Sequence, residues 1–197
     1  MSSIEEPRIT NDNDLAHVKR VVEARRTNLL MDQDRSVDET LLRELLALIR
    51  WAPNHKRTWP WQVAVFVGES RCALGEACAV DLIAAGMTDE AKLTKTRGKY
   101  LRSPVVIGVG QRPNNDPHRV GEDRDAVAAG IQNFLLGATA TGLASYWGSA
   151  ADPLGSALLK VCGFAGGSRV SALIYLGWPT SQPEPPVRPE LPIIWHR

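Results

Sequence analysis

The chain has 197 residues, of which 44% are apolar, and its 23 Lys and Arg against 22 Asp and Glu leave a net charge of +1. This length predicts roughly one domain that can bury a full hydrophobic core. The near-neutral charge argues against nucleic-acid binding and against attachment to an acidic membrane surface. The partner that we expect is therefore a small molecule or another protein.

The cysteine and histidine patterns exclude several classes of site. Cys72, Cys78 and Cys162 form no C-x-x-C pair, which predicts buried thiols in a reduced cytoplasm rather than a disulfide framework or a zinc knuckle. The four histidines lack the H-E-x-x-H pattern, so we expect no metal site. The N-terminus is polar and no stretch approaches 18 apolar residues, so we expect neither a signal peptide nor a membrane span.

The N-terminal part of the chain predicts two helices. Apolar residues at helical spacing follow Asn13 and Asp14, either of which can cap a helix that runs to about Arg26. Ser36 and Glu39 stand as S-x-x-E before an apolar run, which is a capping-box signature for a second helix.

The rest of the chain alternates strands and helices. The expected elements are an inner strand at 62–68, helices at 70–85 and 88–102, a strand at 105–110, a mobile polar loop at 111–124, a helix at 128–142 ended by Gly142, a strand at 143–147, a helix from Asp152 to Gly163 and a strand at 170–177. This order predicts one α+β fold with a mixed central sheet of four to five strands.

Three segments follow from this pattern. Residues 1–13 are expected to be disordered or loosely held, and residues 14–178 form the folded domain. Residues 179–197 hold six of the 13 prolines, so they predict an extension that runs along a surface and is not a central strand.

The sequence lacks the common nucleotide-binding and nucleophile motifs. It contains neither G-x-G-x-x-G after the first strand nor G-x-x-x-x-G-K-[ST], and it has no G-x-S-x-G elbow. Gly108 and Gly110 lie inside a predicted strand, which favours a close approach of neighbouring groups over a phosphate loop. A bound cofactor is therefore the better source of any reactivity.

Two local patterns could bind such a cofactor. Arg25, Arg26 and Thr27 end the first helix, where basic residues either complement the helix dipole or clamp an anion with a hydroxyl beside them. The link at residues 51–62 gathers three of the six tryptophans together with Asn54 and His55, which is unusual for a loop.

Four motifs in chain order carry a resemblance to a known family. They are R-R-T at 25–27, A-P-N-H-K-x-x-x-P-W at 52–61, GLASYWGSA at 142–150 and YLGWP at 175–179. Together they resemble the nitroreductase family of FMN-dependent oxidoreductases, and within it a short branch of NAD(P)H nitroreductases. The likeness extends from about Ala16 to Pro179.

The resemblance implies a homodimer with two FMN molecules at the interface, each contacted by both chains. It implies a nitroreductase-like fold, and it places Arg25, Arg26 and Thr27 at the FMN phosphate and ribityl chain. The loop with Asn54 and His55 would reach the FMN of the other subunit. Further positions implied to bind the cofactor are Trp147, Gly148 and Ser149 beside the isoalloxazine and phosphate, and, by a looser match, Arg188 near the phosphate.

The sequence departs from close relatives at Trp51 and Gly148, where Arg is frequent. We therefore expect the phosphate to depend more on Arg25, Arg26 and Arg188, and we expect a more apolar pocket with Trp51 in its wall.

The function implied by the resemblance is transfer of a hydride from NADH or NADPH through FMN to nitroaromatic, quinone or similar acceptors, with ping-pong kinetics. No catalytic side chain is required, because the flavin N5 carries the chemistry. An FMN-binding storage protein with little turnover is the alternative, and a cofactor-free interaction module is a third possibility.

Overall fold

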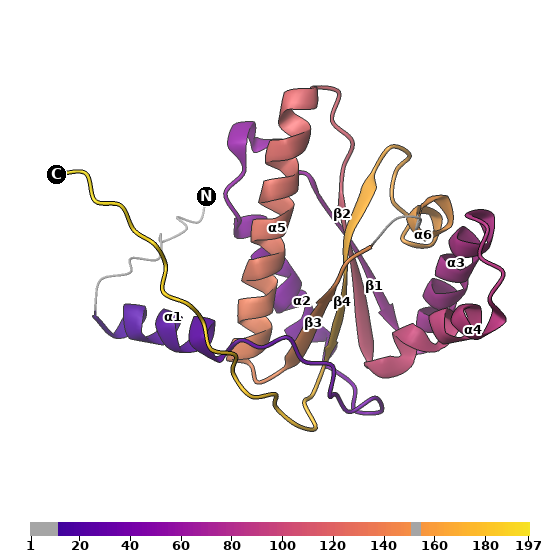
Figure 1. The fold of residues 1–197 in the computed structure, drawn as a ribbon, viewed down its shortest axis with the longest axis horizontal. Helices are drawn as coiled ribbons and strands as arrows, with labels where there is room; N and C mark the ends of the chain where they lie inside the picture. The colour runs from indigo at the N-terminus through magenta and orange to yellow at the C-terminus, as the bar shows by residue number, and fades with distance from the viewer. Residues whose placement is uncertain (1–11, 151–154) are drawn as a thin grey trace, which may run out of the picture.

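The computed structural model describes residues 12–150 and 155–197 and has a central sheet between two layers of helices (Figure 1). The elements are α1 (Asp12–Ala24), α2 (Glu39–Ala47), the 3-10 turns η1 (Leu48–Trp51) and η2 (His55–Arg57), β1 (Trp61–Val67), α3 (Ser70–Ala84), α4 (Glu90–Gly98), η3 (Lys99–Arg102), β2 (Val105–Gln111), α5 (Pro117–Ala140), β3 (Ala144–Gly148), α6 (Ser156–Val161) and β4 (Arg169–Gly177). The predicted order of helices and strands is confirmed.

Some predicted features fall on residues that the structure does not describe. The loosely held segment at 1–13 lies outside the described residues except for residues 12 and 13, which belong to α1. The predicted opening of a helix at Asp152 also lies outside them. Within the described ranges, no helix is long and apolar enough to cross a membrane.

The sheet has four strands in the order β1-β2-β4-β3, and all three pairings are antiparallel. The expected mixed sheet is therefore wrong for these strands, and the only parallel pairing among the described residues is an isolated bridge between Thr27 and Ser145. The first strand was expected to be an inner one, but β1 pairs with β2 alone. Runs of β-branched residues fit an edge strand as well as a central one, so the sequence could not separate the two.

Each face of the sheet carries its own hydrophobic core, under the helices that Figure 1 shows on both faces. On one face α2 and α5 pack against the sheet, and Ile107, Phe134 and Ile174 are fully buried there. On the other face α3, η3 and α6 enclose a second core around Leu74, Tyr100 and Tyr175, with α4 packed outside against α3 and η3. β2 is buried along its whole length, as a strand covered on both faces should be.

Two helix starts differ from the prediction. The cap of α2 is Asp38, whose carboxylate accepts the Leu41 N–H at 3.0 Å, so the expected capping box at Ser36 is wrong. The expected mobile loop at 111–124 is also partly wrong, because α5 begins at Pro117 behind an Asp116 cap. Proline at the first helical position has the required φ and loses no hydrogen bond there, so this proline starts a helix.

Three glycines behave as the sequence predicts. A Cβ on Gly110 would lie 2.5 Å from the Phe164 ring, and one on Gly108 would lie 3.0 Å from the Cys162 sulfur. These strand glycines thus permit close packing, as expected. Gly142 follows the end of α5 with φ +81°, a conformation that favours glycine after a helix.

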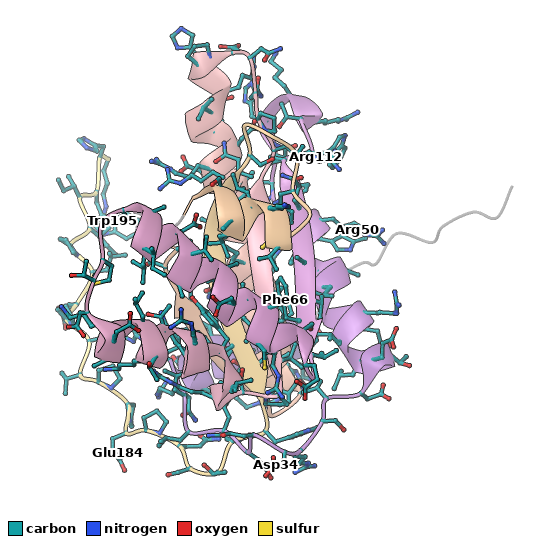
Figure 2. The ribbon with its side chains drawn as sticks, turned by 90° about the vertical axis from the view of Figure 1, so that its right-hand side faces the viewer. Asp34, Arg50, Phe66, Arg112, Glu184 and Trp195 are labelled. Atoms are coloured by element: carbon teal, nitrogen blue, oxygen red, sulfur yellow. The ribbon has the colours of Figure 1, made fainter. Side chains whose placement is uncertain are left out.

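The two ends of the described chain lie on one side of the molecule (Figure 1). α1 extends from the body, and Leu15, Val18 and Val22 on it are exposed. The C-terminal extension is first held by the segment after α1, through a Thr180 N–H that donates to the Leu30 carbonyl at 2.9 Å. Figure 2 follows the rest of the extension from Glu184 to Trp195 along the outside of the fold.

Candidate functional site

The R-R-T segment lies beside the strand that carries the third motif. Thr27 forms the parallel bridge with Ser145 of β3, and the Asn28 N–H donates to the Ser145 carbonyl at 2.9 Å. Ser145 is buried and two residues later Trp147 is exposed. The structure therefore places Thr27 beside the strand that carries the third motif. Because the bridge is parallel, Arg25 and Arg26 lie toward the start of β3, where Arg26 shares a cavity with Leu143 and Ala144. The expected grouping of these arginines with Trp147–Ser149 stays a prediction.

Some hydrogen-bond donors of the R-R-T segment have no partner within the described chain. Arg26 is half-buried and its guanidinium donates to the carbonyls of Glu23 at 2.5 Å and Arg25 at 2.9 Å. Arg25 is also half-buried, and in the described ranges its guanidinium has no hydrogen bond or ion pair. The Thr27 hydroxyl is exposed. An arginine without a carboxylate partner is free to donate charge-assisted hydrogen bonds to an anionic phosphate.

The C-terminal end of β3 is open at the surface. Trp147 is 38% exposed, and Ser149 is exposed after it. A Cβ on Gly148 would meet the Leu173 carbonyl at 3.1 Å and the rings of Tyr146 and Tyr175 at 3.5 Å. An arginine at this position would therefore require its neighbours to shift, which is consistent with the glycine found here.

The loop that joins η1 to β1 has a strained backbone. Lys56, Arg57 and Trp59 have φ values of 58°, 56° and 52°, in the left-handed region that L-residues avoid. Such conformations persist only where the surroundings fix them, and they concentrate at functional sites. His55, Lys56 and Arg57 are exposed at the tip of this loop.

Asn54 holds this loop from inside. Its side-chain oxygen accepts the Trp59 N–H at 2.8 Å, and its amide nitrogen donates to the Thr58 hydroxyl at 3.0 Å. Both ends of the amide are thus engaged within the loop. Asn54 therefore shapes the loop, and its expected contact with the cofactor stays a prediction. His55 is the exposed residue of the pair.

The sequence did not identify Asp123 as the anchor of the loop. This carboxylate is 2% exposed; one oxygen accepts from the Thr58 hydroxyl and the other accepts the Asn114 amide at 2.8 Å. Asp123 lies in the segment that was expected to be a mobile loop, so its place in α5 could not be inferred. The signal that could have found it is the Asp116–Pro117 helix start.

The tryptophans of this region divide into exposed and packed rings. Trp51 and Trp59 are exposed, whereas Trp61 is half-buried and its indole N–H donates to the Ala126 carbonyl at 3.0 Å. Trp178 is half-buried under the Arg35 guanidinium, 4.0 Å from the ring centroid. Trp51, Trp59 and Trp147 therefore remain available to a ligand, and Trp61 and Trp178 serve packing.

The candidate residues form two groups at opposite edges of the sheet. Arg25–Thr27 and Trp147–Ser149 lie at the β3 edge, whereas the loop with Asn54 and His55 precedes β1 at the other edge. A cavity of about 370 Å³ between α1, η1 and α5 contains Trp51, and one of about 100 Å³ contains Arg26. Neither cavity contains residues of both groups. Arg188 lies exposed in the C-terminal extension and joins neither group through a polar contact in the described chain.

The buried thiols and phenols supply no nucleophile. The Cys78 sulfur lies 3.1 Å from the Tyr100 hydroxyl, and burial raises the pKa of both groups. Burial also raises the pKa of Cys162 to about 12, so these side chains stay protonated at neutral pH. Cys72 is exposed, which corrects the expectation that this thiol is buried, whereas Cys78 is buried as expected. No group of three potential metal ligands occurs in the residues that could be searched.

The chain resembles known proteins in sequence and in fold. The chain is 27% identical over 175 residues to "Putative NAD(P)H nitroreductase YfhC" of Bacillus subtilis, with 85% of this chain and 87% of that protein covered. Its fold matches a solved nitroreductase-like family protein from Bacillus cereus with a TM-score of 0.78 at 26% identity, covering 96% of this chain and 99% of that one. It also matches a nitroreductase with bound FMN from Bacteroides fragilis, with a TM-score of 0.72 at 21% identity over 95% and 100% of the two chains.

The family model of nitroreductases matches residues 22–178, which include the R-R-T segment, the strained loop and the whole sheet. Because this match covers most of the chain and agrees with the fold, the protein belongs to the nitroreductase family.

Proposed function

We propose that the protein is an FMN-dependent NAD(P)H oxidoreductase that reduces nitroaromatic, quinone or similar electron-poor acceptors with ping-pong kinetics. The observation that carries the proposal is the half-buried Arg25, whose guanidinium has no acidic partner in the described residues, in the segment that bridges to β3 at Ser145. The relative in Bacillus subtilis has NAD(P)H nitroreductase in its name, and the similar chain from Bacteroides fragilis was solved with FMN.

Each residue would contribute a specific interaction. Arg25 and Arg26 would hold the phosphate by charge-assisted hydrogen bonds, and the Thr27 hydroxyl would bind a ribityl oxygen. Trp147 would supply an aromatic wall, and a backbone N–H between Trp147 and Ser149 would donate to the N5 edge. Bound FMN supplies the hydride carrier between the nicotinamide and the acceptor. Because both substrates need the same exposed ring face, they would bind in turn, which gives ping-pong kinetics.

We propose further that the site is completed by a second copy of the chain. The two groups of candidate residues lie at opposite edges of one sheet, so one chain alone does not surround a planar cofactor. Large apolar side chains are exposed on the elements that would meet a partner; they are Leu15, Val18, Val22 and Trp51 near α1, and Leu191, Ile193, Ile194 and Trp195 in the extension. Exposed apolar surface of this extent is typical of an interface. In the dimer, the loop tip with His55 would reach the site formed by Arg25 and Trp147 of the other chain.

Anaerobic mixing of the FMN-loaded protein with NADH or NADPH tests this function. We expect the visible absorbance of the oxidised flavin to disappear within seconds to minutes, and to return when a nitroaromatic compound or a quinone is added. If FMN binds but neither nicotinamide bleaches it, the storage function is correct and the reductase is not. If the protein binds no FMN, the interaction module remains.

A further inference from the structure

A concave site outside the candidate cofactor residues lies where β2 ends, β4 begins and α5 has its first turns. This hollow, which we call the arginine hollow, has a volume of about 210 Å³ and is lined by Arg112, Arg124 and Arg169, with Gln111 and Gly167 among its other residues. None of the candidate cofactor residues lines it. Figure 2 shows Arg112 near this end of the molecule.

Two of the three arginines that line the hollow have no acidic partner. Asp116 and Glu122 both pair with Arg119, at 3.4 and 3.1 Å, and Asp123 accepts from Thr58 and Asn114. Asp125 lies 3.4 Å from Arg124. Arg112 and Arg169 have no acidic partner anywhere in residues 12–150 and 155–197. Two exposed guanidinium groups without an acidic partner therefore line one hollow, and both are free to donate to an anion there.

The frame that carries these arginines is fixed by hydrogen bonds. The Gln111 amide, 5% exposed, donates to the Val120 carbonyl at 2.8 Å, and the Arg112 N–H donates to the Pro60 carbonyl at 2.8 Å. Gly167 has φ +79°, and a Cβ there would lie 3.3 Å from Pro113 across the hollow. Because the walls are set before a ligand arrives, little ordering is needed to bind one.

We propose that the arginine hollow binds a phosphate group. A phosphate dianion matches the two arginines that lack a partner, and its oxygens accept from several guanidinium forks at once. A carboxylate carries a single charge and is satisfied by one fork, so it would leave a cation unpaired. The volume is about seven times that of one water in the liquid, enough for a phosphate group. The group is either free phosphate or the phosphate of a nucleotide.

Titration calorimetry of the full chain at low ionic strength, with inorganic phosphate and then AMP as probes and acetate as control, tests the proposal. We expect saturable phosphate binding outside the candidate flavin site, at least tenfold weaker in Arg112→Ala and in Arg169→Ala, and weak or undetectable binding of acetate. Arg50→Ala removes another exposed arginine and should leave the affinity unchanged. Tighter binding of AMP than of phosphate assigns the site to a nucleotide, and equal binding assigns it to free phosphate.

Two results would overturn the proposal. One is the absence of saturable phosphate binding, or equal weakening by Arg50→Ala, which indicates nonspecific attraction. The other is a loss of binding in Arg25→Ala but not in Arg169→Ala, which would place the phosphate in the candidate flavin site. Because the titration needs no turnover and no bound FMN, its outcome is separate from that of the reductase proposal. Circular dichroism melts check that the variants fold.

Discussion

The buried Asp123 carboxylate fixes the loop that presents His55. Through Thr58 it connects α5 to Asn54, and this chain of contacts holds three residues with positive φ. Left-handed conformations cost roughly 1–2 kcal/mol per non-glycine residue, so the loop would relax without the anchor.

Removing the Thr58 hydroxyl should therefore release the loop. We expect Thr58→Val to lower the free energy of unfolding by about 1–3 kcal/mol, because a buried carboxylate oxygen loses its donor. Thr58→Ser keeps the hydroxyl and should cost clearly less. Urea unfolding gives the stabilities, and the fluorescence of exposed Trp59 reports the loop. Equal losses in both variants would show that the methyl packing of Thr58 matters and the hydrogen bond does not.

Arg25 carries the proposed contact with the cofactor phosphate. Arg25→Ala should weaken FMN binding by about 1.5–3 kcal/mol, the range for a hydrogen bond to a charged group, and should leave the fold intact because the side chain has no partner in the described part of the chain. Fluorescence titration with FMN measures the loss. An unchanged dissociation constant would mean that the phosphate lies elsewhere.

At this scale the sequence predicted residue types better than their contacts. Arg25–Thr27 could be placed beside the third motif because the resemblance fixed their order along the chain. The inward turn of Asn54 could not be foreseen, since it depends on Thr58 and on Asp123, 65 residues beyond Thr58. Long-range hydrogen bonds of this kind leave no local pattern.

At the scale of elements, caps decide where helices begin. Sequence patterns located every strand and every helix core, some by apolar spacing and others by the residues at their ends. The sequence did not predict two helix starts correctly. At Asp38 several neighbouring residues could serve as the cap. At Asp116–Pro117 the proline could either begin or interrupt a helix. The parallel or antiparallel direction of strand pairs could not be predicted from the sequence either, since alternation looks the same in both.

The N-terminus of α6 is capped by a side chain from another helix, and this side chain is buried. The Asp81 carboxylate on α3 accepts the N–H groups of Gly155 at 2.8 Å and of Ala157 and Leu158 at 3.0 Å. Asp81 is 5% exposed. If its carboxylate is removed, the three N–H groups cannot bind water instead unless the structure opens. This single residue joins two helices that lie on the same face of the sheet.

Asp81→Asn should destabilise the protein by about 2–3 kcal/mol, because an amide group replaces one acceptor oxygen among three donors. Asp89→Asn is the matched control: Asp89 is exposed and caps α4 through the Lys92 N–H alone, and asparagine caps as well as aspartate. Urea unfolding compares the two. Similar stabilities in both variants would contradict a central role for the Asp81 cap.

At the scale of the whole molecule, the buried thiols make stability depend on alkaline pH. Unfolded cysteines ionise near pH 9, whereas burial raises the pKa of Cys162 to about 12 and also raises that of Cys78. Below pH 9 both states are protonated and the thiols leave stability unchanged. As the pH rises further, the unfolded chain loses protons that the folded chain keeps, so stability falls until the folded pKa is reached.

We expect the free energy of unfolding to fall between pH 9 and pH 11 by about 1.4 kcal/mol per pH unit for each buried thiol, with a further contribution from Tyr100 and Tyr175. Urea unfolding across this range measures the slope. Cys162→Ala should make it shallower, and Cys72→Ala should not, because Cys72 is exposed. A slope that Cys162→Ala leaves unchanged would mean that this thiol is not desolvated.

The candidate residues lie at two opposite edges of the sheet, so the proposed function depends on whether two chains assemble into a dimer. Arg25 belongs to the β3 edge and His55 to the loop before β1, and the apolar surface of α1 and of the extension is exposed. Light scattering should therefore give the mass of two chains, and a stable monomer would leave the two groups apart.

Mixing two defective variants tests the shared site most directly. Arg25→Ala and His55→Ala are each expected to lose NAD(P)H-dependent reduction of a quinone as homodimers. If each site takes Arg25 from one chain and His55 from the other, heterodimers contain one intact and one doubly altered site. Random pairing of equal amounts should then restore about a quarter of the wild-type activity. Activity that never exceeds the average of the two homodimers would show that each site is built within one chain.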